Sequence, residues 1–249
     1  VKKIIENTIY GVDIQKRAIH LAHLRLWLSL IVDMEIENIK DIPPLINLDF
    51  KVLEGDSLVS KIFGYPFDTR RRIGVDQKVF ELIKQISSLK EKHAEACNTK
   101  EKKELSDKIE KKKRDIALWH LNQIKKQKIK ELFGVKNQLS LFKKDKQRDL
   151  FEKTDQEREG LENEINEIKS KMQKIREGGE IEAFNWFLDF FEVMGTKEGF
   201  DIVMGNPPYG IKVPKDIAKD EFWLESKDSY GVFTAMALNI LKPNGTLCF

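Results

Sequence analysis

Cysteine is scarce in this sequence, which contains only Cys97 and Cys248 among its 249 residues. Two cysteines exclude both a disulfide-stapled scaffold and a cysteine-rich zinc site. The sequence also lacks any run of about 18 uncharged apolar residues, which excludes a membrane-spanning helix. The start of the sequence, Val1–Ile4, carries no signal-peptide hydrophobic region. We therefore expect a cytoplasmic protein with no membrane partner.

Proline is absent between Arg70 and Glu180, and all seven prolines lie outside this stretch. The stretch holds 30 Lys and Arg against 21 Asp and Glu, a net charge of +9, whereas the rest of the chain has 14 basic and 20 acidic residues, a net charge of −6. Composition and charge therefore divide the chain into three parts. We predict a first core part over residues 1–69, a charged helical insertion over 70–180 and a second core part over 181–249.

The two outer parts alternate predicted strands with predicted helices. Short β-rich runs occur at Thr8–Asp13, Phe50–Leu53 and Phe200–Met204. Apolar periodicity predicts a helix over Gln15–Val32, and we predict a further helix over Tyr230–Leu241. Strands that alternate with helices are typical of a parallel, doubly wound α/β sheet. We predict a partial Rossmann-like sheet of this kind, into which the helical part is inserted.

Polar residues follow three of these strands. Asp13 ends the first, Asp56 follows the second and Asn206 follows the third. In open parallel sheets, ligands bind beyond the carboxyl ends of the strands. The pattern therefore places the candidate binding and catalytic residues at one edge of the predicted sheet.

The middle part of the chain has the apolar spacing of packed helices. Apolar residues recur every three or four positions among charged neighbours, which is typical of an antiparallel coiled-coil hairpin or a small bundle. We predict a long helix over Asn98–Phe133 that stops at Gly134, and a last helix that begins at a capping box at Thr154–Glu157 and ends at Gly178-Gly179. A solvated helical surface and contact with nucleic acid explain the basic charge about equally well.

The tetrapeptide Asn206-Pro207-Pro208-Tyr209 is the most informative motif. Two prolines fix the backbone and remove N–H donors, so the loop presents acceptors. The Asn206 side-chain oxygen and the Pro207 carbonyl can accept both hydrogens of an amino group on a flat ring, and Tyr209 can stack on that ring. A plain Asn-Pro turn is the alternative interpretation.

This motif resembles motif IV of the S-adenosylmethionine-dependent amino-group methyltransferases. Tyr10–Gln15, with the helix behind it, resembles their acidic cofactor motif, and Gly55–Leu58 resembles the next cofactor motif. The resemblance implies S-adenosyl-L-methionine as the cofactor. It also implies three contacts: Asp13 with the ribose hydroxyls, Asp56 with the adenine amine and Ile14 with the adenine ring, while Ser57 lies in the second motif.

The wider resemblance is to adenine-N6 DNA methyltransferases of type II restriction–modification systems, including those fused to a nuclease. Leu24–Leu30, Phe184–Phe187 and Phe190–Val193 carry it, together with segments that follow motif IV. It implies double-stranded DNA with a flipped adenine as the partner.

The family's glycine-rich first motif and its target recognition domain are not found, so we expect a fragment that is inactive by itself. Methylation of RNA or of protein glutamine is the alternative activity, and a non-catalytic scaffolding module built on the helices is the alternative without activity.

The sequence contains two further, weaker signals. Gln138–Phe142, which we expect in a loop between helices, resembles the peptide that docks on the bacterial sliding clamp, although such short matches also arise by chance. His20 and His23 lie three residues apart on a predicted helix without further ligands at suitable spacing, so we predict no metal site.

Overall fold

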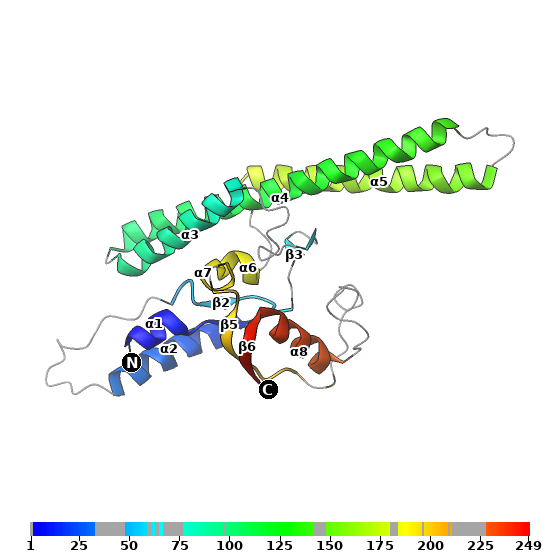
Figure 1. Ribbon diagram of the computed structural model, residues 1–249. Helices are drawn as coiled ribbons and strands as arrows, with labels where there is room; N and C mark the ends of the chain where they lie inside the picture. The colour runs from blue at the N-terminus through cyan, green and yellow to red at the C-terminus, as the bar shows by residue number, and fades with distance from the viewer. Residues whose placement is uncertain are drawn as a thin grey trace. The chain divides into compact units, whose positions relative to one another are not determined.

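The structure is a computed structural model of the chain. It describes residues 2–32, 48–58, 61–62, 65–66, 77–96, 98–141, 148–179, 184–195, 197–208, 210 and 228–249. The elements follow one another as α1 (Lys2–Thr8), β1 (Gly11–Asp13), α2 (Lys16–Val32), β2 (Val52–Glu54), β3 (Lys61–Ile62), β4 (Tyr65–Pro66), α3 (Gln77–Glu95), α4 (Thr99–Leu141), α5 (Arg148–Arg176), α6 (Trp186–Asp189), α7 (Phe191–Met194), β5 (Phe200–Met204), α8 (Ser229–Ile240) and β6 (Leu241–Cys248) (Figure 1).

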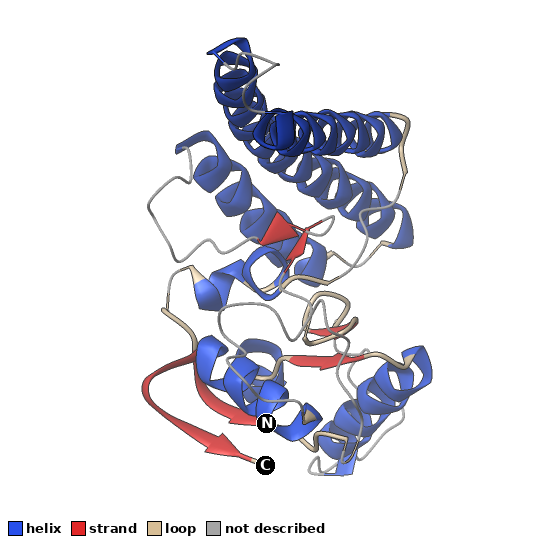
Figure 2. Cartoon of the chain, turned by 90° about the vertical axis from the view of Figure 1, so that its right-hand side faces the viewer, coloured by secondary structure: helices blue, strands red, loops and turns tan. Residues whose placement is uncertain are grey.

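Helices make up most of the described chain, and its strands are short (Figure 2). The described strands form three two-stranded sheets, in which β1 pairs with β2, β3 with β4 and β5 with β6. The β1–β2 and β5–β6 pairs are parallel, whereas β3 and β4 are antiparallel. The fold class is therefore α/β, with small parallel sheets among the helices, as the alternation of strands and helices predicts.

The chain divides into two compact units. The first contains Val1–Ile109 and Glu182–Phe249, and the second contains Glu110–Ile181. The strands and the residues of the predicted site all belong to the first unit. The second unit holds most of α4 and all of α5.

An aromatic cluster forms the centre of the first unit. Phe190, whose side chain is fully buried, contacts Tyr10, Phe184, Trp186 and Phe200 with ring centroids 5.0, 5.3, 5.6 and 6.2 Å away. Tyr10 directly precedes β1 and Phe200 is the first residue of β5. Both strands begin at this cluster, so its packing fixes the start of each. β1 then ends at Asp13, and β5 leads to Asn206.

The turn of helix that carries the cluster is closed by reciprocal hydrogen bonds. The side-chain oxygen of Asn185 accepts from the backbone N–H groups of Phe187 and Leu188, at 3.0 and 3.1 Å. The carboxylate of Asp189 accepts from the backbone N–H of Asn185 at 2.8 Å. Asn185 is thus the N-cap of α6 and satisfies donors that a short helix leaves unpaired.

A partly buried charged network links α3 and α7 to the start of both strands in the β1–β2 pair. The Lys51 ammonium donates to the Tyr10 hydroxyl at 2.5 Å and lies 3.6 Å from Glu192, which also pairs with Lys90 at 3.5 Å. Lys90 donates further to the backbone oxygen of Asp189. Burial, followed by the charge of Glu192, raises the pKa of Tyr10, and burial lowers the pKa of Lys51 against the opposing effect of Glu192.

In the second unit, α4 and α5 form an antiparallel pair. Lys128 pairs with Glu164 at 3.0 Å and Lys136 pairs with Glu162 at 2.8 Å, so a later residue of α4 meets an earlier residue of α5. The two helices run side by side in Figure 1. Apolar side chains at roughly heptad spacing are buried in this unit: Ile116, Ala117, Leu121, Val135, Leu161, Ile165, Ile168, Met172 and Ile175. The pattern is that of the predicted helical hairpin.

Two predicted helix boundaries in this unit are wrong. α4 continues through Gly134 to Leu141 because Val135 is buried and Lys136 pairs with α5, which outweighs the cost of about 1 kcal/mol for an exposed helical glycine. α5 begins at Arg148 rather than at the predicted capping box. The Thr154 hydroxyl instead donates to the Leu150 carbonyl one turn earlier, at 2.8 Å, as threonine does inside a helix.

The predicted end of α5 at Gly178-Gly179 is confirmed. Gly178 has a φ of 90°, and the N–H of Gly179 donates to the carbonyl of Lys174 at 2.9 Å. The peptide that resembles a clamp-binding sequence was expected in a loop, but Gln138–Leu141 form the last turn of α4. Phe142 lies outside the described residues, and the clamp contact stays a prediction.

Candidate functional site

Pairing of β1 with β2 brings the two acidic positions of the predicted cofactor site to one edge. Asp13 is in register with Glu54, and the N–H of Gly55 donates to the carbonyl of Asp13 at 2.9 Å. Asp56 follows immediately after Gly55. Both aspartates therefore lie at the carboxyl end of the same parallel strand pair, where the sequence predicts them.

Asp13 shapes the turn between β1 and α2 while it keeps an exposed carboxylate. Its Oδ1 accepts from the backbone N–H of Gln15 at 2.7 Å, one residue before α2 begins. The next side chain, Ile14, is 68% exposed. An ionised carboxylate has acceptor sites beyond the one that this turn uses, so the edge offers acceptors beside an apolar surface.

Two hydrogen bonds hold the loop after β2, one within the loop and one from a distant tryptophan. The Asp56 carboxylate accepts from the N–H of Leu58 at 2.9 Å, and the Ser57 carbonyl accepts from the indole N–H of Trp186 at 2.9 Å. Position 55 requires glycine because an added Cβ would collide with the Cβ of Phe184. The aromatic cluster thus holds the Asp56–Ser57 loop in place, a connection across 129 residues that no local sequence pattern reveals.

The loop after β5 carries the candidate catalytic residues. The N–H of Gly205 donates to the Cys248 carbonyl at 3.1 Å, which extends the β5–β6 pair up to the motif. Asn206 is exposed and Pro207 is buried. The Pro208 carbonyl accepts from the Ser229 hydroxyl at 2.5 Å, where α8 begins. The sequence assigned Ser229 no role in the site, because 21 residues separate it from the carbonyl that it binds.

This loop is anchored at its strand and at α8, and its asparagine stays accessible. Asp228 caps α8 by accepting from the N–H of Tyr230 at 3.5 Å, which adds support to the Ser229 contact. Proline at 207 and 208 leaves no N–H at either position. Tyr209 lies outside the described residues, so its predicted stacking role stays a prediction. The loop is therefore held in place beside an exposed side-chain amide.

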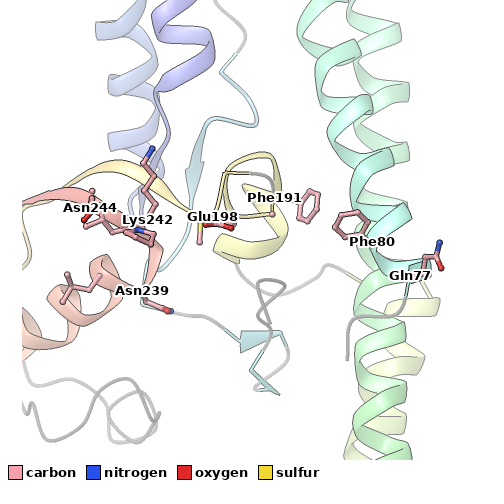
Figure 3. Close-up of a pocket in the computed structure, with 13 residues that line it drawn as sticks. Gln77, Phe80, Phe191, Glu198, Asn239, Lys242 and Asn244 are labelled. Atoms are coloured by element: carbon pink, nitrogen blue, oxygen red, sulfur yellow. The ribbon is translucent and has the colours of Figure 1, made fainter. Parts of the chain in front are cut away.

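A hollow of about 1180 Å³ occurs elsewhere in the first unit, at the amino ends of β5 and β6. Figure 3 shows Phe80 and Phe191 facing each other on one side of it, with Glu198, Lys242 and Asn244 among the other lining residues. The two rings pack edge to face, with centroids 5.6 Å apart. The hollow includes none of the predicted site residues, which follow the opposite ends of the strands.

Two other features are absent from the described part of the chain. No group of three or more His, Cys, Asp or Glu side chains in it is arranged to hold a metal ion. Within the same residues, no helix combines the length and the apolar character needed to cross a membrane.

Comparison with known proteins gives a family match and matches among the curated proteins. Residues 7–249 match the family model described as Eco57I restriction-modification methylase. The chain is also 28% identical, over 271 aligned positions, to a protein of Methanocaldococcus jannaschii named "Putative type II restriction enzyme and methyltransferase". That alignment covers 99% of this chain and 22% of the relative, so the chain spans about a fifth of the relative's length. No solved structure matches the chain.

Proposed function

Because the chain belongs to the Eco57I restriction-modification methylase family, we propose that it forms the catalytic core of a DNA methyltransferase that methylates adenine at N6. The observation that carries this proposal is the position of Asn206–Pro208 just after the parallel strand β5, with the Pro208 carbonyl bound by Ser229 of α8. The methyl donor is S-adenosyl-L-methionine, and the substrate is an adenine flipped out of duplex DNA.

The residues at the β1–β2 edge suit this cofactor. Asp13 presents a carboxylate to solvent next to the exposed Ile14, a combination that matches ribose hydroxyls beside a flat, largely apolar ring. Asp56 and Ser57 lie in the second loop of the same edge, and the Asp56 carboxylate accepts a hydrogen bond from the N–H of Leu58. The bound cofactor would supply a methyl group on a positively charged sulfur.

The residues after β5 would prepare the target nitrogen. The lone pair of an adenine amino group is delocalised into the ring, which makes it a poor nucleophile. The Asn206 side-chain oxygen and the Pro207 carbonyl would accept its two hydrogens and favour a tetrahedral nitrogen. These acceptors would also stabilise the positive charge that develops there as the methyl group arrives. Tyr209 would stack on the flipped base.

We extend the proposal to the fold around the site. The β1–β2 and β5–β6 pairs belong to one doubly wound methyltransferase sheet, and the residues over 70–180 form an insertion into it. The aromatic cluster supports this arrangement, since Tyr10 and Phe200, at the starts of β1 and β5, lie with ring centroids 5.6 Å apart.

Transfer of a labelled methyl group by the full-length protein tests the proposed function. We expect incorporation into duplex DNA that contains adenine, N6-methyladenine after digestion, and no incorporation when every adenine is replaced by its 6-deamino analogue. Incorporation into RNA or into protein glutamine, without incorporation into DNA, would contradict the proposal and favour the alternative substrates.

Replacing Asp13 with alanine should weaken cofactor binding. Loss of a hydrogen bond to a charged group costs about 1.5–3 kcal/mol, so calorimetry should show an affinity for S-adenosylmethionine lower by roughly 10- to 150-fold. Glu54→Ala is the matched control, because Glu54 is in register with Asp13 and is also exposed. Equal affinities of the Asp13→Ala variant and the unmodified protein would show that Asp13 serves only the turn.

Two substitutions of Tyr209 separate its ring from its hydroxyl. Stacking of a base on an aromatic side chain contributes about 1–3 kcal/mol. Tyr209→Phe keeps the ring and should stay largely active, whereas Tyr209→Ala should lose both DNA affinity and rate. The loss in the alanine variant should shrink when the target adenine is mispaired, since extruding it then costs less. Equal damage from Phe and Ala would refute the stacking role.

A further inference from the structure

The distal half of α4 has two different faces within the second unit. One face is turned to α5, with which Lys128 and Lys136 form ion pairs, and Leu121 and Val135 are buried on the same side of the helix. Residues three or four positions apart share a face of a helix. By that spacing, a second set lies together on the other face: Asn122, Lys126, Ile129, Lys130, Phe133 and Asn137. We call this set the outer face of α4.

The outer face is accessible. Lys126, Lys130 and Asn137 are exposed, and so are the apolar side chains of Ile129 and Phe133, at 46% and 68%. Among the residues that the structure describes, no ion pair involves Lys126 or Lys130. The face extends from Asn122 to Asn137, about 23 Å at 1.5 Å per residue.

The distal half of α4 is rich in lysine and poor in acidic residues, a charge balance that favours binding of a polyanion. Ile116–Leu141 contains five lysines and a single acid, Glu131. Glu131 is engaged by Lys128 at 3.2 Å and by the amide of Gln127 at 3.1 Å. The outer face itself therefore has two cations and two side-chain amides but no carboxylate. α5, by contrast, has seven basic and eight acidic residues between Arg148 and Arg176.

We propose that the outer face of α4 binds the phosphate backbone of duplex DNA without reading its sequence. Lysine and asparagine are among the side chains that contact phosphate oxygens in protein–DNA complexes. Duplex DNA carries one negative charge per about 1.7 Å of helix axis, so a face of this length meets several phosphates. The inference rests on the proposed function in one respect, namely that duplex DNA is the substrate.

The salt dependence of DNA binding tests this proposal in the full-length protein. Each phosphate contact contributes about 0.9 to the slope of log affinity against log salt concentration. The double variant Lys126→Gln/Lys130→Gln should lower that slope by about 1.8. Between 50 and 200 mM salt, the unmodified protein should then lose about 12-fold more affinity than the variant does. Fluorescence anisotropy with a labelled duplex of random sequence measures this difference.

The matched control removes the same charge from the other helix. Lys169 and Lys174 are exposed on α5, and Lys169→Gln/Lys174→Gln should leave the slope unchanged. Both double variants keep good helix formers, and circular dichroism checks that they remain folded. An equal fall in slope for the two double variants would overturn the proposal, because net charge rather than the outer face would then govern binding.

Two other outcomes would also overturn it. If the unmodified protein methylates adenine in DNA and the α4 variant keeps the full slope, this inference fails and the proposed function stands. If the unmodified protein has no affinity for DNA, both fail together. Self-association that is lost in Ile129→Ser/Phe133→Ser, with an unchanged slope in the lysine variant, would assign the outer face to contact with protein instead.

Discussion

Replacing Asn206 with alanine is expected to lower the rate constant of methyl transfer by 10²-fold or more, with little change in cofactor affinity. The side-chain amide oxygen is proposed to accept a hydrogen from the target amino group as positive charge develops on its nitrogen. Loss of one positioned hydrogen bond of this kind costs about 10²- to 10³-fold in rate. Single-turnover transfer of labelled methyl groups measures the effect separately from product release.

The loss of rate in Asn206→Ala should come from the missing acceptor oxygen of the side chain and not from a disturbed fold. Asn206 is exposed, so alanine there leaves no cavity and no buried polar group unpaired. Asn206→Asp keeps an acceptor oxygen in the same place and should retain more activity than alanine does. Ser229→Ala removes the hydrogen bond to the Pro208 carbonyl and should reduce the rate less, because Ser229 only positions the loop. Near-normal turnover in Asn206→Ala would refute the assigned role.

Elements with a strong local signal could be predicted from the sequence. The predicted strand over Phe200–Met204 agrees with β5, and α2 and α8 lie within one residue of the predicted bounds. Both helical segments are rich in apolar residues and contain no proline, and Pro243-Asn244-Gly245 follows the second. The continuation of α4 past Gly134 could not be predicted in this way, because it depends on packing with α5 rather than on the local propensity of glycine.

The edge that carries Asp13 and Asp56 could also be predicted, since parallel strands that pair bring their carboxyl ends together. The contacts that hold this edge in place could not be predicted from the sequence. Lys90 has no feature that distinguishes it from the other basic residues of the chain, yet it is buried and pairs with Glu192, which lies 102 residues later. The contact of Ser57 with Trp186 likewise joins distant segments with no shared pattern.

Replacing Phe190 with alanine is expected to destabilise the first unit by about 3–5 kcal/mol, the usual cost of truncating a buried phenylalanine. Phe190 is fully buried and contacts four aromatic rings, including Tyr10 before β1 and Phe200 at the start of β5. A cavity at this position removes packing from both strand pairs at once. Since small domains have net stabilities of about 5–15 kcal/mol, this loss is a large fraction of the total.

The midpoint of urea unfolding, followed by circular dichroism, measures this loss. Phe133→Ala is the matched control: it removes the same atoms from a side chain that is 68% exposed, and it should change the free energy of unfolding by less than about 0.5 kcal/mol. Phe190→Leu keeps most of the buried volume, and its unfolding midpoint should fall between those of the two alanine variants.

Cofactor affinity should decrease in Phe190→Ala at temperatures where the protein is still folded. The reason is that the aromatic cluster holds the start of β1 and, through Trp186, the Ser57 loop. Equal unfolding midpoints for Phe190→Ala and Phe133→Ala would show that the cluster does not hold the strands in place.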